Sequence, residues 1–142
     1  MKIHDGDVLT VFGERRAVIA GEVGGAPEFL DRRVRDRIKR EFAMRAKEIM
    51  RGMPPDLRPK KLAVKDTRSR WGSCSAAGAI SLSWRLAFAP PPVMRYVVVH
   101  ECCHLAEMNH GAEFWNLVAR FCPGHGAARA WLRRNGGGLF EF

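Results

Sequence analysis

The segment at residues 91–108 constrains the fold most, because it is apolar nearly all the way round a helix. The three prolines at 90–92 stop the preceding chain and suit the first turn of a new helix. Residues 97–99, all valine, are alone typical of a strand, but the apolar pattern continues well beyond the usual length of a strand. A helix without a polar face has to be buried. We therefore predict a buried helix over residues 91–108.

Further helices are predicted on both sides of this segment. A long basic helix is expected at 27–53, where Pro54-Pro55 ends it. Its apolar positions lie four and seven residues apart on one face: Val34, Ile38, Phe42, Ile49 and Met53. Two more helical patterns cover residues 112–121 and 126–135, the second of which runs into three glycines.

Four short segments are typical of strands. Apolar runs at 8–12 and 16–20 surround Gly13-Glu14 and predict a β-hairpin within residues 1–26. Residues 62–66 and 79–84 predict two further strands, the second with apolar and serine residues in alternation. Together with the helices they indicate the α+β class, with a core at residues 58–135.

Length and cysteine usage favour one domain in a reducing compartment. A chain of 142 residues can bury a core without disulfides. Its cysteines show no framework spacing and stand at 74, 102, 103 and 122. No apolar run approaches the roughly 20 residues of a membrane helix, and the first 26 residues lack the apolar core of a secretory signal. We expect a single domain at 1–142, cytoplasmic localisation and no membrane partner.

Three of the five histidines fall within eleven residues, in His100-Glu101-Cys102-Cys103-His104 and His110. His100 and His104 are four residues apart, so on a helix both rings project from one face and suit one metal ion. His110 can join them only if the helix breaks, and Met108-Asn109 is the expected break. Unpaired rings on an apolar helix would cost several kcal/mol, so we favour metal ligands over core histidines. The two cysteines are expected to pack in the core.

Three histidine ligands leave the fourth position of a tetrahedral zinc ion open, which is typical of a catalytic site. Glu101 lies about 100° round the helix from His100, where its carboxylate can reach a metal-bound water without ligating the metal. Zinc lowers the pKa of that water to about 7, and Glu101 would pass its proton to the leaving group. We expect a hydrolase with one Zn²⁺ per chain, although imidazole also accepts nickel or cobalt.

Longer stretches of the chain resemble a known family. They are RWGSCS at 70–75, GAISLSWRL at 78–86, YVVVHECCHL at 96–105, and NHG at 109–111 with Phe114-Trp115. In this order they resemble the YgjP-like metallopeptidase family of zincins, with the SprT-like proteases as more distant relatives. Metzincins share the histidine spacing, but they require Gly where Glu107 stands and a Met-turn downstream, which the chain lacks.

The resemblance implies a zincin-like fold, in which a small β-sheet packs on a buried active-site helix with further helices. It implies a metallopeptidase with Glu101 as general base and three metal ligands, His100, His104 and His110. It also suggests that residues 70–75 and 80–84 border the cleft, where an edge strand could hold an extended peptide. Candidate substrate-binding residues are then Arg70, Trp71, Ser73 and Ser83. Candidate donors to an oxyanion are Tyr96, His125 and Arg70.

The positive charge is concentrated in one segment. Residues 27–70 hold 15 Lys and Arg against 7 Asp and Glu, whereas the whole chain has a net charge of +9. Such a segment attracts polyanions, although a solvated helix face is the simpler interpretation. Two alternatives therefore stay open beside a peptidase. One is a metal-dependent nucleotide or phosphate-ester hydrolase that uses Arg68 and Arg70. The other is a nucleic-acid-associated protease whose basic helix docks to DNA.

Overall fold

The structure is a computed structural model that describes residues 8–17, 32–67 and 69–137. Its elements follow in the order β1 (Val8–Val11), β2 (Glu14–Ala17), α1 (Arg32–Arg51), η1 (Pro55–Leu57), β3 (Lys61–Lys65), β4 (Gly72–Cys74), β5 (Ala79–Ser83), η2 (Trp84–Phe88), α2 (Pro91–Cys103), α3 (Ala112–Phe121) and α4 (His125–Asn135). The predicted α+β class is confirmed. No helix among the described residues has both the length and the apolar character needed to cross a membrane.

The strands form two small sheets. β1 and β2 pair antiparallel, and the other three strands lie in the order β3-β5-β4. The central strand β5 is parallel to β3 and antiparallel to β4, where Ser73 pairs with Ser81. β4 therefore forms one edge of the three-stranded sheet.

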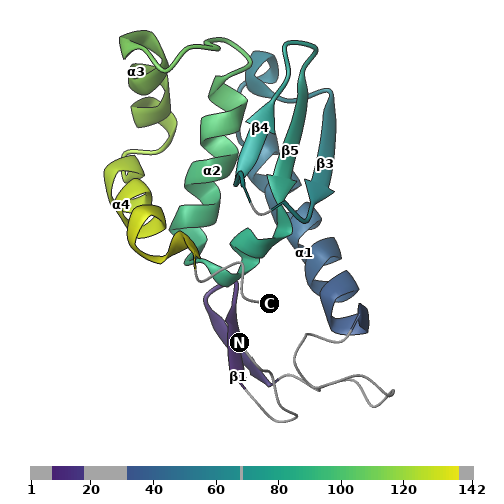
Figure 1. Cartoon of the computed structure of the whole chain (residues 1–142). Helices are drawn as coiled ribbons and strands as arrows, with labels where there is room; N and C mark the ends of the chain where they lie inside the picture. The colour runs from purple at the N-terminus through teal and green to yellow at the C-terminus, as the bar shows by residue number, and fades with distance from the viewer. Residues whose placement is uncertain (1–7, 18–31, 68, 138–142) are drawn as a thin grey trace.

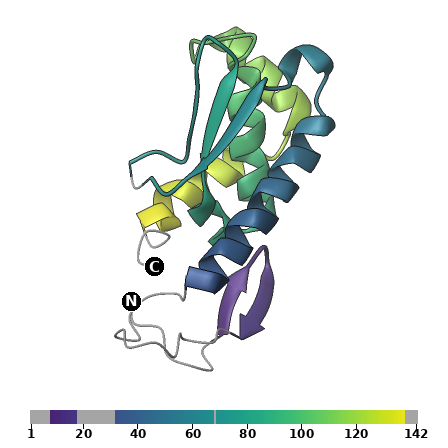
Figure 2. The same ribbon diagram turned by 90° about the vertical axis from the view of Figure 1, so that its right-hand side faces the viewer.

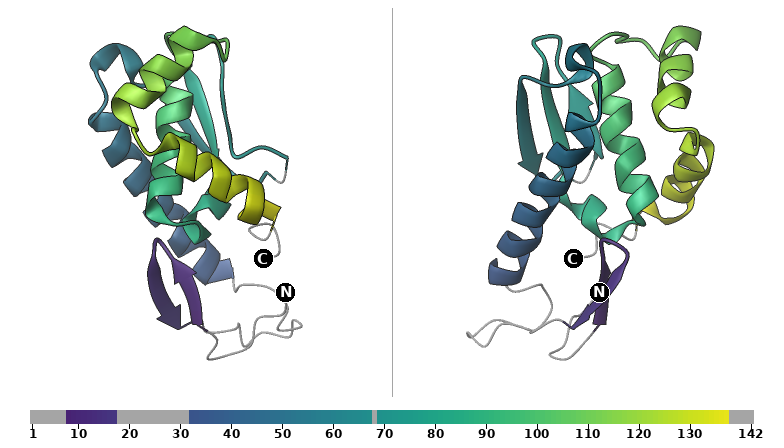
Figure 3. Two further views of the ribbon diagram at one scale, coloured as in Figure 1. Left: turned by 90° about the vertical axis from the view of Figure 1, so that its left-hand side faces the viewer. Right: turned by 180° about the vertical axis from the view of Figure 1, so that it is seen from behind.

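Helix α2 runs through the middle of the molecule, with the three-stranded sheet on one side and α3 and α4 on the other (Figure 1). Helix α1 crosses the sheet on the face that also meets α2 (Figure 2). The view from behind shows α1 and α2 next to each other, with α4 on the far side of α2 (Figure 3). The predicted small sheet on a buried helix is confirmed by this arrangement.

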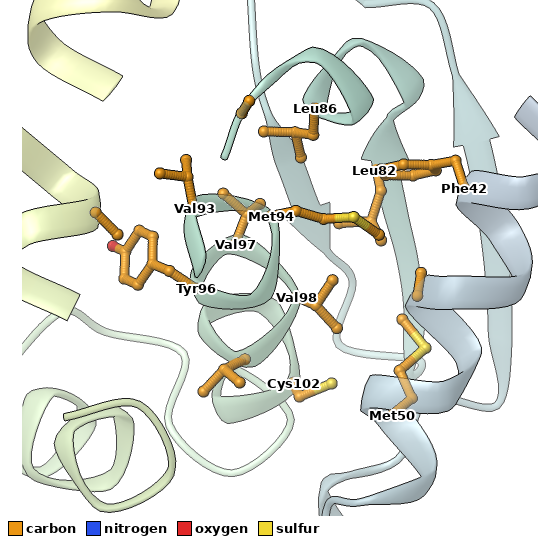
Figure 4. Close-up of a cluster of buried hydrophobic side chains, with 14 of the residues drawn as sticks. Phe42, Met50, Leu82, Leu86, Val93, Met94, Tyr96, Val97, Val98 and Cys102 are labelled. Carbon is orange, nitrogen blue, oxygen red and sulfur yellow. The ribbon is translucent and has the colours of Figure 1, made fainter. Parts of the chain in front are cut away.

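Burial of α2 is nearly complete, as its apolar sequence predicts. Figure 4 shows Met94 and Val98 pointing from α2 toward α1 and β5, where Phe42 and Leu82 lie. Tyr96 points the other way, toward α4. Val98, Val99, Cys102 and Cys103 have no exposed surface. The four cysteines are all free thiols, and the predicted core packing of Cys102 and Cys103 is confirmed.

Several predicted boundaries were wrong. Helix α2 ends at Cys103 and not at Met108. Residues 72–74 form the strand β4, which no apolar alternation indicated, and Trp84 begins the 3-10 helix η2 instead of continuing β5. The long basic helix is described from Arg32 to Arg51, and its predicted start at residue 27 lies outside the described residues, as does Arg68.

The hairpin prediction is confirmed over the described residues 8–17, with a shifted turn. Phe12 and Gly13 form the loop, and both have positive φ, 52° and 78°, as in a type I′ turn. Phe12 holds this conformation with a buried ring and an N–H that donates to the Ala87 carbonyl at 2.8 Å. The contact docks the hairpin on the element that precedes α2.

A charged cluster ties the hairpin to α1. Arg16 of β2 donates two hydrogen bonds to the Glu41 carboxylate, at 2.7 and 2.9 Å, and Arg45 donates a third at 3.0 Å. The Arg16 hydrogen bond is the main reason that the pKa of Glu41 falls to about 2, against the opposing effect of partial burial. Glu41 therefore stays ionised in the folded chain down to low pH.

Candidate metal centre

Three imidazole rings converge at the carboxyl end of α2. The Nε2 atoms of His100 and His104 are 3.2 Å apart, those of His104 and His110 are 3.0 Å apart, and those of His100 and His110 are 3.3 Å apart. Nitrogens that bind one zinc ion at about 2.0–2.1 Å with tetrahedral angles lie roughly 3.3 Å from one another. The three donor atoms therefore fit a single metal ion, as their spacing in the sequence predicts.

The early end of α2 makes this convergence possible. The His104 N–H still bonds to the carbonyls of His100 and Glu101, at 3.3 and 3.2 Å, so His104 keeps its helical place one turn after His100. The chain then turns, and the Glu107 carbonyl lies 2.9 Å from His104 Nδ1. A helix that continued to Met108 would carry His110 away from the other two rings, because six residues span about 9 Å along a helix.

Two of the three rings are oriented through their second nitrogen. Tyr96 Oη lies 3.0 Å from His100 Nδ1, one helical turn earlier on α2. With Nε2 facing the metal position, Nδ1–H of His100 donates to Tyr96, and Nδ1–H of His104 donates to the Glu107 carbonyl. Burial raises the pKa of Tyr96 to about 12, so it remains a neutral phenol that holds the ring.

Glu101 lies beside this centre in a confined space. Only 6% of its surface is exposed, and burial raises the pKa of its carboxyl to about 7. Gly72 of β4 lies directly against it, since a Cβ atom there would come within 2.9 Å of Glu101 Cγ and 3.0 Å of Oε2. A carboxyl with such a pKa can both accept and release a proton near neutral pH.

Aromatic side chains of α3 cover the histidines. Phe114 stacks on His104 with 4.4 Å between ring centroids, and Trp115 stacks on His110 at 6.1 Å. His125, at the start of α4 and not in the predicted loop, stacks on Trp115 at 5.7 Å. These ring contacts limit the rotation of the histidine rings.

A cavity of about 440 Å³ opens next to the centre. His100 and Glu101 border it together with Tyr96 and Val97 of the same helix. One wall comes from the approach to β4, with Arg70, Trp71 and Gly72, and the opposite wall from α4, with Arg129, Leu132 and Arg133. We call this cavity the cleft.

The structure separates the predicted substrate-binding residues. Arg70 and Trp71 line the cleft, and Ser73 lines an adjoining hollow of about 330 Å³ that shares Arg70 with it. Ser83 is fully buried, and its hydroxyl donates to the Thr67 carbonyl at 3.4 Å. Its predicted contact with a substrate is therefore wrong, because a side chain without accessible surface cannot meet a ligand.

Of the predicted oxyanion donors, only some lie at the cleft. Tyr96 and Arg70 border the cleft, whereas His125 is not among its lining residues. Gly72 belongs to the stretch 70–75 that was expected to border the cleft, whereas sequence reasoning missed the residues of α4: Arg129, Leu132 and Arg133. Their only signal in the sequence was the spacing of four between the two arginines, which a solvated helix face shows equally well.

A family model, a solved structure and the curated proteins were compared with the chain. The family model described as YgjP-like, metallopeptidase domain, matches residues 18–135. The crystal structure of the metallopeptidase zymogen of Pyrococcus abyssi abylysin is similar, with 23% sequence identity and a TM-score of 0.49 over 68% of this chain and 91% of that chain. No curated protein matches the sequence significantly.

Proposed function

The chain belongs to the YgjP-like metallopeptidase family, and from this premise we propose that it is a zinc-dependent peptidase with His100, His104 and His110 as ligands. The observation that supports this most is the convergence of three Nε2 atoms within 3.3 Å of one another beside the buried Glu101. Three neutral imidazoles with one open position are typical of catalytic zinc sites. We expect one Zn²⁺ per chain.

Zinc supplies Lewis acidity when bound, which polarises a carbonyl group and acidifies water. Glu101 then acts as the general base: its carboxylate accepts a proton from the attacking water and delivers it to the amine that leaves. Tyr96 keeps its own hydroxyl proton while it accepts from His100, so Tyr96 and Arg70 are the candidate donors to the oxyanion.

A peptide substrate suits the open edge of β4. The carbonyl of Trp71 accepts from the Ser83 N–H at 2.8 Å, and Ser75 N–H donates to the Ala79 carbonyl at 2.8 Å, so these residues pair toward β5. Alternate residues of an antiparallel strand point their backbone groups the other way. The N–H and carbonyl of Gly72 therefore face the open edge, where an extended peptide can pair beside Glu101.

Metal content and peptide hydrolysis test the proposal together. Untagged wild type, His104→Ala and Glu101→Gln are compared by mass spectrometry and with casein as substrate, and Glu113→Gln, an exposed residue of α3, is the matched control. We expect one zinc in wild type, Glu101→Gln and the control, little zinc in His104→Ala, and hydrolysis only in wild type and the control. No zinc in any variant after addition of the metal would contradict the proposal.

One feature of the cleft favours a second candidate function. Arg70, Arg129 and Arg133 place three guanidinium groups around the same cavity, and guanidinium suits phosphate. A metal-dependent nucleotide or phosphate-ester hydrolase is therefore the alternative. Assays of nucleoside triphosphates beside casein distinguish the two functions. Glu101→Gln should abolish the hydrolysis that this site catalyses and leave hydrolysis by a contaminating enzyme unchanged.

The cellular compartment follows from the thiols. All four cysteines are free, which fits a reducing environment. We propose a cytoplasmic location.

A further inference from the structure

Two arginines of α4 face the cleft from consecutive turns of the helix. Arg129 and Arg133 are four residues apart, so about 6 Å of helical rise separates them. Like charges at this spacing destabilise a helix slightly when nothing lies between them. Arg70 adds a third positive charge from the opposite wall. Glu101 is the single acidic side chain among the described residues that line this cavity.

These three cations have no ionic partner within the described parts of the chain. The side-chain ion pairs found there involve other arginines: Arg16, Arg45 and Arg85. Arg129 is instead held over the indole ring of Trp115, with its guanidinium carbon 4.1 Å from the ring centroid. A guanidinium held over an aromatic ring can still use its N–H groups to bind a planar anion.

The apolar residues of the cleft strengthen the positive electrostatic potential of the three arginines. Trp71, Val97 and Leu132 provide apolar walls. A concave site with apolar walls and charges of one sign focuses the electric field on a ligand of the opposite sign. The cavity also adjoins the open edge of β4, where the backbone of an extended peptide would lie beside Glu101.

We propose that this peptidase selects acidic peptides, and that Arg129 and Arg133, with Arg70 opposite, bind a carboxylate of the substrate near the bond to be cleaved. This inference rests on the proposed function and adds the substrate class. The carboxylate belongs to an Asp or Glu side chain or to the carboxyl terminus of the peptide. Both have the planar pair of oxygens that a guanidinium binds in bidentate fashion.

Matched peptides test the proposal. The substrates are short alanine-rich peptides, capped at both ends, that carry one Glu, one Gln or one Lys, and an uncapped all-alanine peptide represents the terminal carboxylate. We expect kcat/KM to be about 10-fold higher with Glu than with Gln, since one charge-assisted hydrogen bond contributes about that factor. Lys should be the poorest residue. Arg129→Gln and Arg133→Gln should each remove most of the ratio between Glu and Gln.

Arg134→Gln is the matched control, because Arg134 is exposed on the same helix and does not line the cleft. It should keep the full ratio between Glu and Gln. Equal rates with the Glu, Gln and uncapped peptides, or a preference for the anionic peptide that is unchanged in Arg129→Gln, would overturn the inference and leave the peptidase function standing. A preference for the uncapped peptide alone would assign the arginines to a terminal carboxylate.

Binding decides the question if no peptide is cleaved. Zinc-loaded Glu101→Gln is titrated with the same peptides by calorimetry. We expect it to bind the Glu peptide more tightly than the Gln peptide. The double variant that also carries Arg129→Gln should bind the two peptides equally. Absence of cleavage with this binding pattern would refute the proposed function and keep the anionic peptide site. Binding and hydrolysis of a nucleoside triphosphate without any binding of the Glu peptide would overturn the inference and favour the phosphohydrolase.

Discussion

Replacement of Gly72 with alanine tests how β4 positions Glu101. The new Cβ would lie 2.9 Å from Glu101 Cγ, 3.0 Å from Oε2 and 3.2 Å from Cδ. Carbon atoms in contact prefer about 3.5–4.0 Å, so the two groups have to separate by roughly 0.5 Å or more. The side chain of Glu101 should yield before the backbone of β4, because β5 holds that strand by paired hydrogen bonds.

The effect on the reaction follows from this displacement. A misplacement of about 1 Å in a reacting group can lower a rate about 100-fold. For Gly72→Ala we therefore expect kcat to fall about 10- to 100-fold, with KM changed little. Zinc content should stay at one per chain, because the added methyl group meets Glu101 and not the ligands. Overpacking of this size should lower the free energy of unfolding by about 1 kcal/mol.

The assay combines peptide hydrolysis, metal analysis and urea unfolding on Gly72→Ala and Gly126→Ala. Gly126 is the matched control, since a Cβ there meets nothing within 4 Å. The control should keep its activity and gain a few tenths of a kcal/mol in stability, as Gly to Ala in a helix usually does. Full activity in zinc-loaded Gly72→Ala would refute the reasoning. Loss of zinc from Gly72→Ala would also refute the reasoning, because β4 would then position the metal-binding histidines and not Glu101 alone.

Three further predictions concern the ligand shell, the charged cluster and the core. Tyr96→Phe removes the hydrogen bond to His100 and should weaken zinc affinity about 10-fold, which competition with a chelator measures; unchanged affinity would contradict the orienting role. Glu41→Gln should lower the free energy of unfolding by about 1 kcal/mol at pH 7. The pKa of Glu41 is about 2 in the folded chain against its ordinary value of 4.5, so this loss should be complete above pH 4.5 and vanish as the pH falls toward 2. Urea unfolding across this range, with the exposed Glu48→Gln as control, checks the sign. Phe42→Ala empties a fully buried position and should lower stability by about 3–5 kcal/mol; a loss under 1 kcal/mol in urea unfolding would contradict the core assignment.

Local periodicity was sufficient for the helices whose ends have local causes. Helix α3 begins and ends where its apolar spacing predicts, at Ala112 and Phe121, and α2 begins at Pro91. The predicted end of α2 at Met108 was wrong because the apolar pattern continues through Leu105 and Met108, although the helix ends at Cys103. His104 Nδ1 meets the Glu107 carbonyl, and the chain turns so that His110 reaches the other two rings.

Strand β4 shows a second kind of limit. Its three residues, Gly-Ser-Cys, carry no apolar alternation and little β-propensity. They form a strand because β5 supplies hydrogen-bonding partners, and Gly72 belongs there because Glu101 leaves no space for a Cβ atom. Neither cause is visible in the segment itself.

The sequence by itself determined which side chains form the centre. Positions four apart on a helix share a face whatever surrounds it, so His100 and His104 were predictable as a pair and Glu101 as their neighbour. Tertiary structure decided what surrounds that chemistry: the contact of Gly72 with Glu101, and the cleft that Arg70, just before β4, lines together with Arg129 and Arg133 of α4. The physical reason is that helical periodicity acts over a few residues, whereas a cleft is made by faces of distant segments whose positions only the packing of the core establishes.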